Sequence, residues 1–218
     1  MARALTDTVP HAAYCFRRLL GMSWNTVRAY AAASWWGVRM ARHCRFGGAP
    51  SFYRHPGSHI CIGSSCRFIS SSLYNRAGVS QRCLISTLCP DARIEIGSGC
   101  GFSGTVIAAA HTIRIGDRVR VGANAVIMDT DWHTDDFRSG VNAPVCIEDD
   151  VWLGMYVTVL KGVTIGRGTL VGAHSLVTRS LPGHVVAAGS PAKILRTFTA
   201  EEISRLEDCS GINPPSAL

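Results

Sequence analysis

The sequence predicts an all-β solenoid, in which short parallel strands coil around one long apolar core, with a helical segment before it and a short helix after it. Aliphatic residues recur at intervals of six, and glycine follows several of them. A six-residue period fits neither an α-helix nor a meander of hairpins. The two long runs and one earlier pair are Ile115, Val121 and Ile127; Ile147, Leu153, Val159, Ile165, Val171 and Val177; and Ile96 with Phe102.

Each hexad is expected to supply one strand and one corner, so that three hexads form one three-sided coil. Successive coils then stack about 4.8 Å apart through parallel ladder bonds. A small or apolar residue also recurs two positions before the main one, for example Val151 before Leu153. Glycine or asparagine is expected at corners that need a permissive backbone.

The residue pattern changes along the chain and divides it into three segments. Residues 1–57 are expected to form an N-terminal helical segment, with residues 10–45 as an amphipathic or buried helix or as two helices broken near Gly21. Its longest charge-free stretch, Ala29–Val38, is too short to span a bilayer. Residues 58–196 form the solenoid, from which residues 128–146 are extruded. In residues 197–218, Thr199 and Glu202 predict a capping box that opens a helix over 200–208.

Positive charge is concentrated near the N-terminus. The formal net charge is +7, and no acidic residue occurs between Asp7 and Asp91. Such a block favours anionic partners, namely phospholipid, a pyrophosphate-linked substrate or nucleic acid. Trp24, Trp35 and Trp36 interleave with the arginines of residues 10–46, which suits peripheral contact with an anionic membrane. The alternative is that these aromatic residues pack on the solenoid or on a neighbouring subunit. No nucleic-acid fold is recognised, so nucleic acid is not an expected partner.

The cysteines indicate a reducing compartment. There are nine, with no CxxC pair and no zinc-finger spacing. We therefore expect free, partly buried thiols in a cytoplasmic protein, which could be peripheral on the inner face of the membrane.

The segment Ile94–Arg196 contains the strings HTIRIGDRVRVGANAVIMDTDWH and APVCIEDDVWLGMYVTVLKGVTIGRGTLVGAHSLVTRSLPGHVVAAGSPAKILR. It resembles the hexapeptide-repeat acyltransferases, above all the maltose, galactoside and Nod-factor O-acetyltransferases and the sugar acetyltransferases of polysaccharide clusters. The resemblance covers about half of the chain. It implies a left-handed β-helix, a homotrimer, acetyl-CoA as donor and a sugar hydroxyl as acceptor, in polysaccharide or glycoconjugate biosynthesis. It implies no metal.

The hexad rhythm breaks between Ile127 and Ile147, and the intervening loop holds five chemistry-bearing side chains. Transfer of an acetyl group to a hydroxyl needs a base of near-neutral pKa, and histidine suits that task. The resemblance assigns this role to His133. We expect Asp131 to orient its ring, a backbone carbonyl being the alternative, and Asp129 to contact the acceptor.

The resemblance also assigns binding residues outside the loop. Ser103 stands where relatives have an asparagine that contacts the acceptor. Cationic residues near the end of the solenoid could neutralise the phosphates of coenzyme A, and small residues such as Gly172 could let its pantetheine approach the backbone. The expected donor contacts are Trp152, Met155, Ala173, Thr178, Arg179, Lys193 and Arg196.

Other functions on the same fold stay open. These are N-acetylation of an amino-sugar nucleotide, acetylation of serine or an antibiotic, and a non-catalytic interaction role. A zinc enzyme of the γ-carbonic anhydrase type is disfavoured, because the remaining solenoid histidines lack its paired spacing. Transfer is expected to be direct, without an acyl-enzyme.

Overall fold

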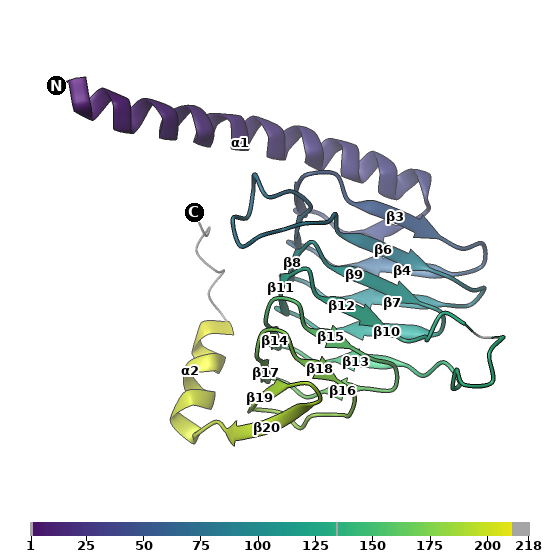
Figure 1. Cartoon of the computed structure of the whole chain (residues 1–218). Helices are drawn as coiled ribbons and strands as arrows, with labels where there is room; N and C mark the ends of the chain where they lie inside the picture. The colour runs from purple at the N-terminus through teal and green to yellow at the C-terminus, as the bar shows by residue number, and fades with distance from the viewer. Residues whose placement is uncertain (1, 134, 211–218) are drawn as a thin grey trace.

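The computed structural model describes residues 2–133 and 135–210, and its strands form three parallel sheets that wrap around one core (Figure 1). Sheet A contains β1 (Arg39–Met40), β4 (His59–Ile62), β7 (Arg93–Ile96), β10 (Thr112–Ile115), β13 (Val145–Ile147) and β16 (Thr164–Ile165). Sheet B contains β2 (Arg45–Gly47), β5 (Arg67–Ile69), β8 (Gly101–Ser103), β11 (Arg120–Ala123), β14 (Trp152–Leu153), β17 (Leu170–Val171), β19 (Val185–Gly189) and β20 (Ala192–Thr197). Sheet C contains β3 (Ser51–Arg54), β6 (Leu84–Thr87), β9 (Val106–Ala109), β12 (Val126–Met128), β15 (Thr158–Val159) and β18 (Leu176–Val177).

The register confirms the predicted coil of three hexads. Residues eighteen positions apart are direct neighbours in all three sheets, and they are the predicted hexad residues. The pairs are Ile147 with Ile165, Leu153 with Val171, and Val159 with Val177. The predicted solenoid is therefore confirmed. Only the last pair of strands, β19 and β20, is antiparallel.

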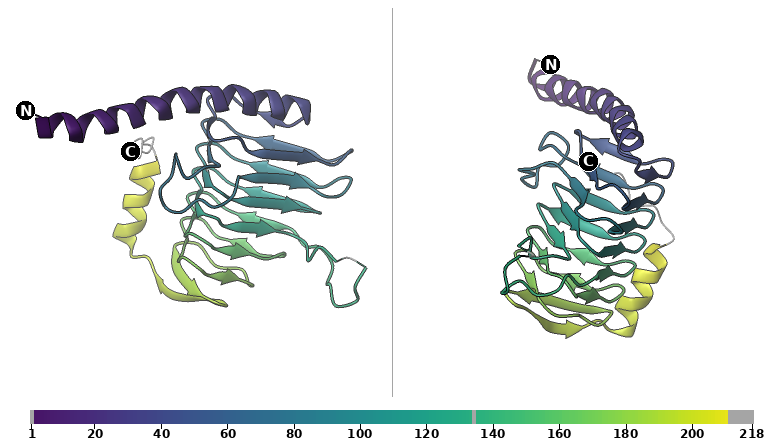
Figure 2. Two further views of the ribbon diagram at one scale, coloured as in Figure 1. Left: turned by 45° about the horizontal axis from the view of Figure 1, so that its top comes forward. Right: turned by 90° about the vertical axis from the view of Figure 1, so that its right-hand side faces the viewer.

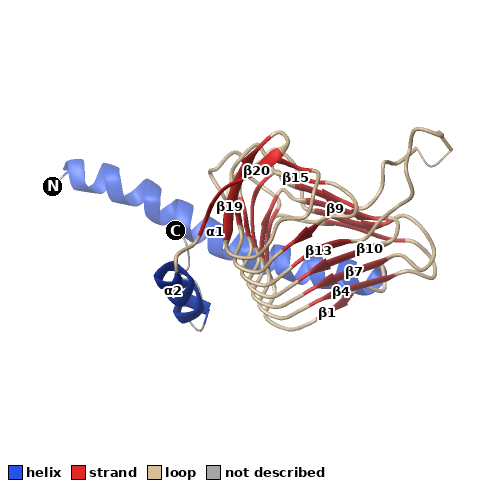
Figure 3. Cartoon of the chain, turned by 90° about the horizontal axis from the view of Figure 1, so that it is seen from below, coloured by secondary structure: helices blue, strands red, loops and turns tan. Residues whose placement is uncertain are grey.

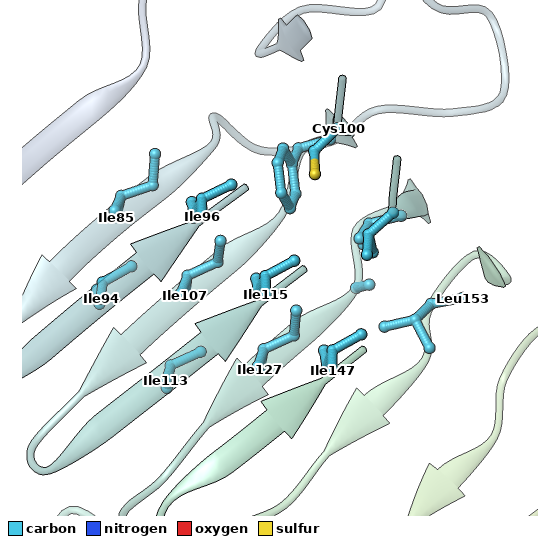
Figure 4. Packing of buried hydrophobic residues seen from close by; sticks show 14 of the residues in the cluster. Ile85, Ile94, Ile96, Cys100, Ile107, Ile113, Ile115, Ile127, Ile147 and Leu153 are labelled. Atoms are coloured by element: carbon cyan, nitrogen blue, oxygen red, sulfur yellow. The ribbon is translucent and has the colours of Figure 1, made fainter. Parts of the chain in front are cut away.

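The core consists of columns of like side chains that repeat from coil to coil (Figure 4). In sheet B three phenylalanines stack, with ring centroids 5.1 Å apart between Phe46 and Phe68 and 4.9 Å apart between Phe68 and Phe102. Isoleucines such as Ile85, Ile107 and Ile127 point inward from sheet C and are fully buried. Removal of this apolar surface from water is the main force that holds the coils together.

The solenoid begins earlier than the sequence indicated. The expected helical segment extended to residue 57, but β1, β2 and β3 already form the first coil and pair with β4, β5 and β6. Phe46 and Phe52 hold the inward positions of this coil, six residues apart. Aromatic residues stand there in place of the aliphatic residues that define the later hexads, which explains why the aliphatic pattern does not extend to them.

One long helix, α1 (Ala2–Trp35), lies across the N-terminal end of the solenoid and extends beyond it (Figures 1 and 2). It closes that end with Ala29 and Ala33, which are buried against the first coil. The break considered near Gly21 does not occur. Instead, Gly21 is a contact point, because a Cβ added there would lie within 2.2 Å of the Tyr74 hydroxyl. Among the described residues, no helix combines the length and apolar character needed to cross a membrane.

The C-terminal helix, α2 (Ala200–Ser210), stands beside the solenoid (Figure 3). The predicted capping box is confirmed: the Thr199 amide donates to Glu202 Oε2 over 2.9 Å, and the Glu202 amide donates to Thr199 Oγ1 over 3.3 Å. The expected tail after this helix lies outside the described residues.

Candidate active site

A loop lies within the expected residues 128–146. It spans residues 129–144, between β12 and β13, and leaves the solenoid at the edge where sheet C gives way to sheet A (Figures 1 and 2). We call it the extruded loop. Two backbone hydrogen bonds close its base. The Ala143 amide donates to the Asp129 carbonyl over 3.2 Å, and the Gly162 amide of the next coil donates to the Ala143 carbonyl over 3.0 Å.

Asp129 is the first residue of this loop, and its side chain is anchored to the preceding coil. Its Oδ1 accepts a hydrogen bond from the Ala110 amide over 2.6 Å, and its Oδ2 accepts one from the His111 amide over 2.9 Å. Burial raises the pKa of the carboxyl group, and the donating amides act in the opposite direction. Both oxygens are thus engaged within this chain, and the residue is 0% exposed. The expected contact of Asp129 with the acceptor stays a prediction.

Asp131 is bound to a lysine of the next coil. Lys161 Nζ lies 2.6 Å from Asp131 Oδ2 and also donates to the Gly140 carbonyl over 2.8 Å. One cation therefore ties both limbs of the extruded loop together. The expected contact between the Asp131 carboxylate and the His133 ring is absent among the hydrogen bonds of the described residues, where the two residues are joined only through the backbone, from the His133 amide to the Asp131 carbonyl over 2.8 Å.

His133 is exposed on the extruded loop, and none of the described residues hydrogen-bonds its ring. Three large apolar side chains of the same loop are exposed as well, beside charged residues such as Asp135 and Arg138. Trp132 is 53% exposed, Phe137 95% and Val141 90%. Large exposed apolar side chains mark surfaces that bind another molecule. We therefore expect a ligand or a second chain to cover this loop. Within the described ranges, no three His, Cys, Asp or Glu side chains gather as a metal site requires.

Ser103 lies apart from the extruded loop. It ends β8 in sheet B, where its Oγ accepts a hydrogen bond from Asn75 Nδ2 over 3.0 Å. It lines a cavity of about 780 Å³ between α1 and the segment after β5, and the lining includes no residue of the extruded loop. One chain therefore does not bring Ser103 together with His133.

The expected donor contacts fall into separate groups. Trp152, Met155 and Ala173 lie on sheet B or on its corner with sheet C. Thr178 and Arg179 follow β18 and lie at the corner between sheets C and A, the same corner from which the extruded loop departs. Sheet C separates the two groups, so one chain does not form a single donor site from them.

The remaining donor residues lie on β20, which ends sheet B. Lys193 is exposed. Arg196 is engaged by α2, with its Nη1 2.8 Å from Glu202 Oε2 and its Nη2 2.9 Å from Glu202 Oε1. Gly172 is also used by the fold, because a Cβ there would lie 2.9 Å from Ala188 Cβ. Its small size therefore serves the packing of β19, and the approach of pantetheine stays a prediction.

The residues that line the cavity beside Ser103 were not singled out from the sequence as site residues. They include three arginines, Arg18, Arg67 and Arg76, together with Tyr14 and Asn75. A signal was available, because the spacing between the inward residues Phe68 and Ile85 is far longer than six. The segment 70–83 is thus a second extruded loop, and we call it the cavity loop.

Two family models match this chain in the solenoid. The model described as bacterial transferase hexapeptide, six repeats, matches residues 147–179, and the hexapeptide repeat of succinyl-transferase matches residues 112–128. These matches coincide with the hexads that the register defines. The chain therefore carries hexapeptide repeats in both of these segments. Its three-sided solenoid is the left-handed parallel β-helix that the resemblance implied.

This hexapeptide-repeat protein has curated relatives with named activities. It is 44% identical over 142 residues to a galactoside O-acetyltransferase from Lactococcus lactis, which covers 62% of this chain and 61% of the relative. It is 37% identical over 92 residues to a 2,3,4,5-tetrahydropyridine-2,6-dicarboxylate N-acetyltransferase from Staphylococcus aureus, covering 42% and 36%. The chain spans about half the length of the first curated relatives it matches.

A solved structure supports the fold. An N-acyltransferase from Bacillus cereus, crystallised with dTDP and 3-hydroxybutyryl-CoA, superposes with a TM-score of 0.61 at 18% identity, covering 79% of this chain and 89% of that one. At this identity the likeness concerns the fold alone.

Proposed function

We propose that this protein transfers the acetyl group of acetyl-CoA to a hydroxyl of a sugar or glycan, with His133 as the general base. The observation that supports it best is the placement of His133. It is exposed on a loop that Asp129 and Lys161 hold against the solenoid, in a chain that is 44% identical over 142 residues to a galactoside O-acetyltransferase.

The proposed reaction needs one proton carrier. As the acceptor oxygen attacks the thioester carbonyl, the imidazole of His133 takes the hydroxyl proton. The tetrahedral adduct then collapses, the carbon–sulfur bond breaks, and the coenzyme A thiolate leaves with a proton. No enzyme nucleophile takes part, so the transfer is direct and forms no acyl-enzyme.

We further propose that the protein acts as a homotrimer. The outward column of sheet A contains arginine and glutamate, and that of sheet B contains four arginines, whereas the column of sheet C contains no charged residue. Its members in register are Ser51, Leu84, Val106, Val126, Thr158 and Leu176. An uncharged, largely apolar sheet face suits burial against another copy.

The separation of the donor contacts supports the same proposal. In an assembly of copies, the sheet B group of one subunit could face the corner of another that bears Thr178, Arg179 and the extruded loop. Coenzyme A would then bind between subunits, with Lys193 near its phosphates. Arg196 could join only by leaving Glu202.

The outer face of α1 supports peripheral contact with an anionic membrane, from the cytoplasmic side. Large apolar residues recur there at intervals of three, four or seven positions, which places them on one helix face, and they are 57–64% exposed. Arginines flank them, and the chain has no acidic residue from position 8 to position 90. Such a helix suits an interface where lipid-linked glycans are found. The stripe consists of Val9, Phe16, Leu20, Trp24 and Val27.

A second candidate is N-acetylation of an amine, which the identity to an N-acetyltransferase of Staphylococcus aureus favours. The same base and donor would serve either reaction. A coupled assay of thiol release from acetyl-CoA, with sugars, amino sugars, nucleotide sugars and lipid-linked oligosaccharides as acceptors, separates the two. Release with hydroxyl acceptors alone supports O-acetylation, and release that requires a free amine refutes it.

A further inference from the structure

The cavity beside Ser103 has rigid walls. The cavity loop is held at the corner after β11, where Asn124 Nδ2 donates to the Gly78 carbonyl over 2.7 Å and the Ser80 amide donates to Asn124 Oδ1 over 3.0 Å. It is held to α1 as well, through the Tyr14 hydroxyl, which donates to the Leu73 carbonyl over 2.7 Å. The cavity of about 780 Å³ is therefore preformed.

Three guanidinium groups converge on this cavity, and its lining residues include no carboxylate. Arg18 and Arg76 both approach the ring of Tyr14, with their Cζ atoms 5.5 Å and 4.8 Å from its centroid. Arg18 donates to the Tyr74 carbonyl over 3.4 Å, and no ion pair joins any of the three arginines to a described carboxylate.

The third arginine, Arg67, lies on the outer face of sheet B, between one residue of β2 and one residue of β8. Its neighbour in one direction is another arginine, Arg45. Its neighbour in the other direction is Gly101, where an added Cβ would meet nothing within 4 Å. Arg67 thus borders open space and is repelled by the charge above it. Like charges held this close destabilise each other unless an anion lies between them.

We propose that this cavity binds the diphosphate group of a phosphorylated ligand through Arg18, Arg67 and Arg76. Planar guanidinium groups bind phosphate oxygens in pairs, and three of them match the charge of a diphosphate. The cavity is larger than a phosphate group requires, and its volume is typical of sites for whole small molecules. Asn75 and Ser103 supply neutral polar atoms for hydroxyl groups, and the ring of Tyr14 supplies a flat apolar surface.

The ligand is assigned as the acetyl acceptor, and that assignment rests on the proposed function. The acceptor would then be a sugar joined to a diphosphate, either in a soluble nucleotide sugar or in a lipid-linked glycan. Because one chain keeps this cavity apart from the extruded loop, His133 of another copy would have to reach it. Diphosphate binding itself does not depend on acetyl transfer.

The test is titration calorimetry of the full chain at low salt with inorganic pyrophosphate and with uridine diphosphate, without acetyl-CoA. We expect binding that weakens about tenfold for each of Arg18→Gln, Arg67→Gln and Arg76→Gln. Arg93→Gln, an exposed arginine of sheet A, is the matched control and should bind as the wild type does. Equal affinity of all variants, or no binding by the wild type, overturns the proposal. Arg76 is exposed, so its variant is expected to fold, and a thermal melt checks this.

Three further binding measurements identify which kind of molecule carries the diphosphate. If uridine diphosphate binds more tightly than pyrophosphate in an arginine-dependent way, the proposal stands with a nucleotide ligand. If vesicles containing a polyprenyl diphosphate bind more tightly, and this gain is lost in the Arg76→Gln variant, the proposal stands with a lipid-linked ligand. If coenzyme A competes with pyrophosphate for the same arginines, the cavity holds the donor, and the assignment to the acceptor is overturned. His133→Ala should bind pyrophosphate normally, which separates failure here from failure of the proposed reaction.

Discussion

Lys161 Nζ lies 2.6 Å from Asp131 Oδ2, two residues before His133. The same nitrogen donates to the Gly140 carbonyl on the return limb of the extruded loop over 2.8 Å. A single side chain of the next coil therefore fixes both limbs between which His133 stands. In this arrangement the Asp131 carboxylate is bound to Lys161, and we propose that it acts through the position of the loop.

The first prediction concerns this pair. Asp131→Asn and Lys161→Met should each lower kcat several-fold, and the double variant should be no worse than the poorer single variant, because both changes remove one interaction. Steady-state kinetics of the three variants measure this. Additive losses would contradict the account. So would a changed pH profile in Asp131→Asn alone, which would place that carboxylate at the ring.

The second prediction concerns acid and the C-terminal helix. The hydrogen bonds from Arg196 and, to a smaller extent, from the Thr199 amide lower the pKa of Glu202 to about 2 from its usual 4.5. Since the pKa is depressed in the folded state, the ionised carboxylate stabilises the start of α2 above pH 4.5, and this contribution is lost as the pH falls toward 2. Amide hydrogen exchange in α2 should therefore show weaker protection as the pH falls through that range.

The control for this effect is Glu202→Gln. In this variant the protection of α2 should already be weak at pH 6, and it should depend less on pH. If wild type and variant lose protection in parallel as the pH falls, the Arg196–Glu202 pair does not hold the helix.

Much of this fold can be predicted from the sequence, because the same six-residue pattern of inward residues repeats along it. Residues such as Leu153 and Val171 are eighteen positions apart and directly adjacent in space, so the hexad period fixes the coil. The loop with His133 was also predictable, as the longest interruption of a well-phased run. The first coil was less evident, because Phe46 and Phe52 replace the aliphatic residues of the repeat.

The cavity loop is visible in the sequence as a break in the hexad spacing, but the cavity itself could not be predicted, since it depends on contacts between distant segments. Tyr14 on α1 meets Leu73 of the cavity loop, and Asn124 holds that loop from a corner more than forty residues away. No local pattern encodes such contacts. The hydrogen-bond partners of Asp129 and Arg196 could not be predicted for a related reason, because they come from other parts of the fold.

The third prediction concerns assembly. Light scattering should give a mass three times the 23.4 kDa of one chain. Val126→Glu introduces a charge in the middle of the uncharged column of sheet C, and it should dissociate the assembly, since an unpaired charge is costly to bury. Thr112→Glu makes the same change on sheet A and should leave the mass unaltered. A monomeric wild type at working concentration would refute an intersubunit site.

The fourth prediction concerns α1. The protein should sediment with anionic vesicles and be released at high salt, because the attraction of the flanking arginines is screened. The double variant Phe16→Ser and Leu20→Ser should lose this binding. Leu195→Ser, which removes an equally exposed leucine on β20, should retain it. If the double variant sediments as well as the wild type does, α1 does not mediate attachment, and its outer face has another partner.

The central claim is that His133 takes the proton from the acceptor, and thiol release from acetyl-CoA in the presence of an accepted sugar tests it most directly. His133→Ala should lower kcat by about 10²–10⁴, as loss of a general base does, while the affinity for coenzyme A stays nearly unchanged. His59→Ala, which removes an exposed histidine of β4 far along the chain from the loop, should retain full activity. An activity of His133→Ala within a fewfold of the wild type would contradict the account.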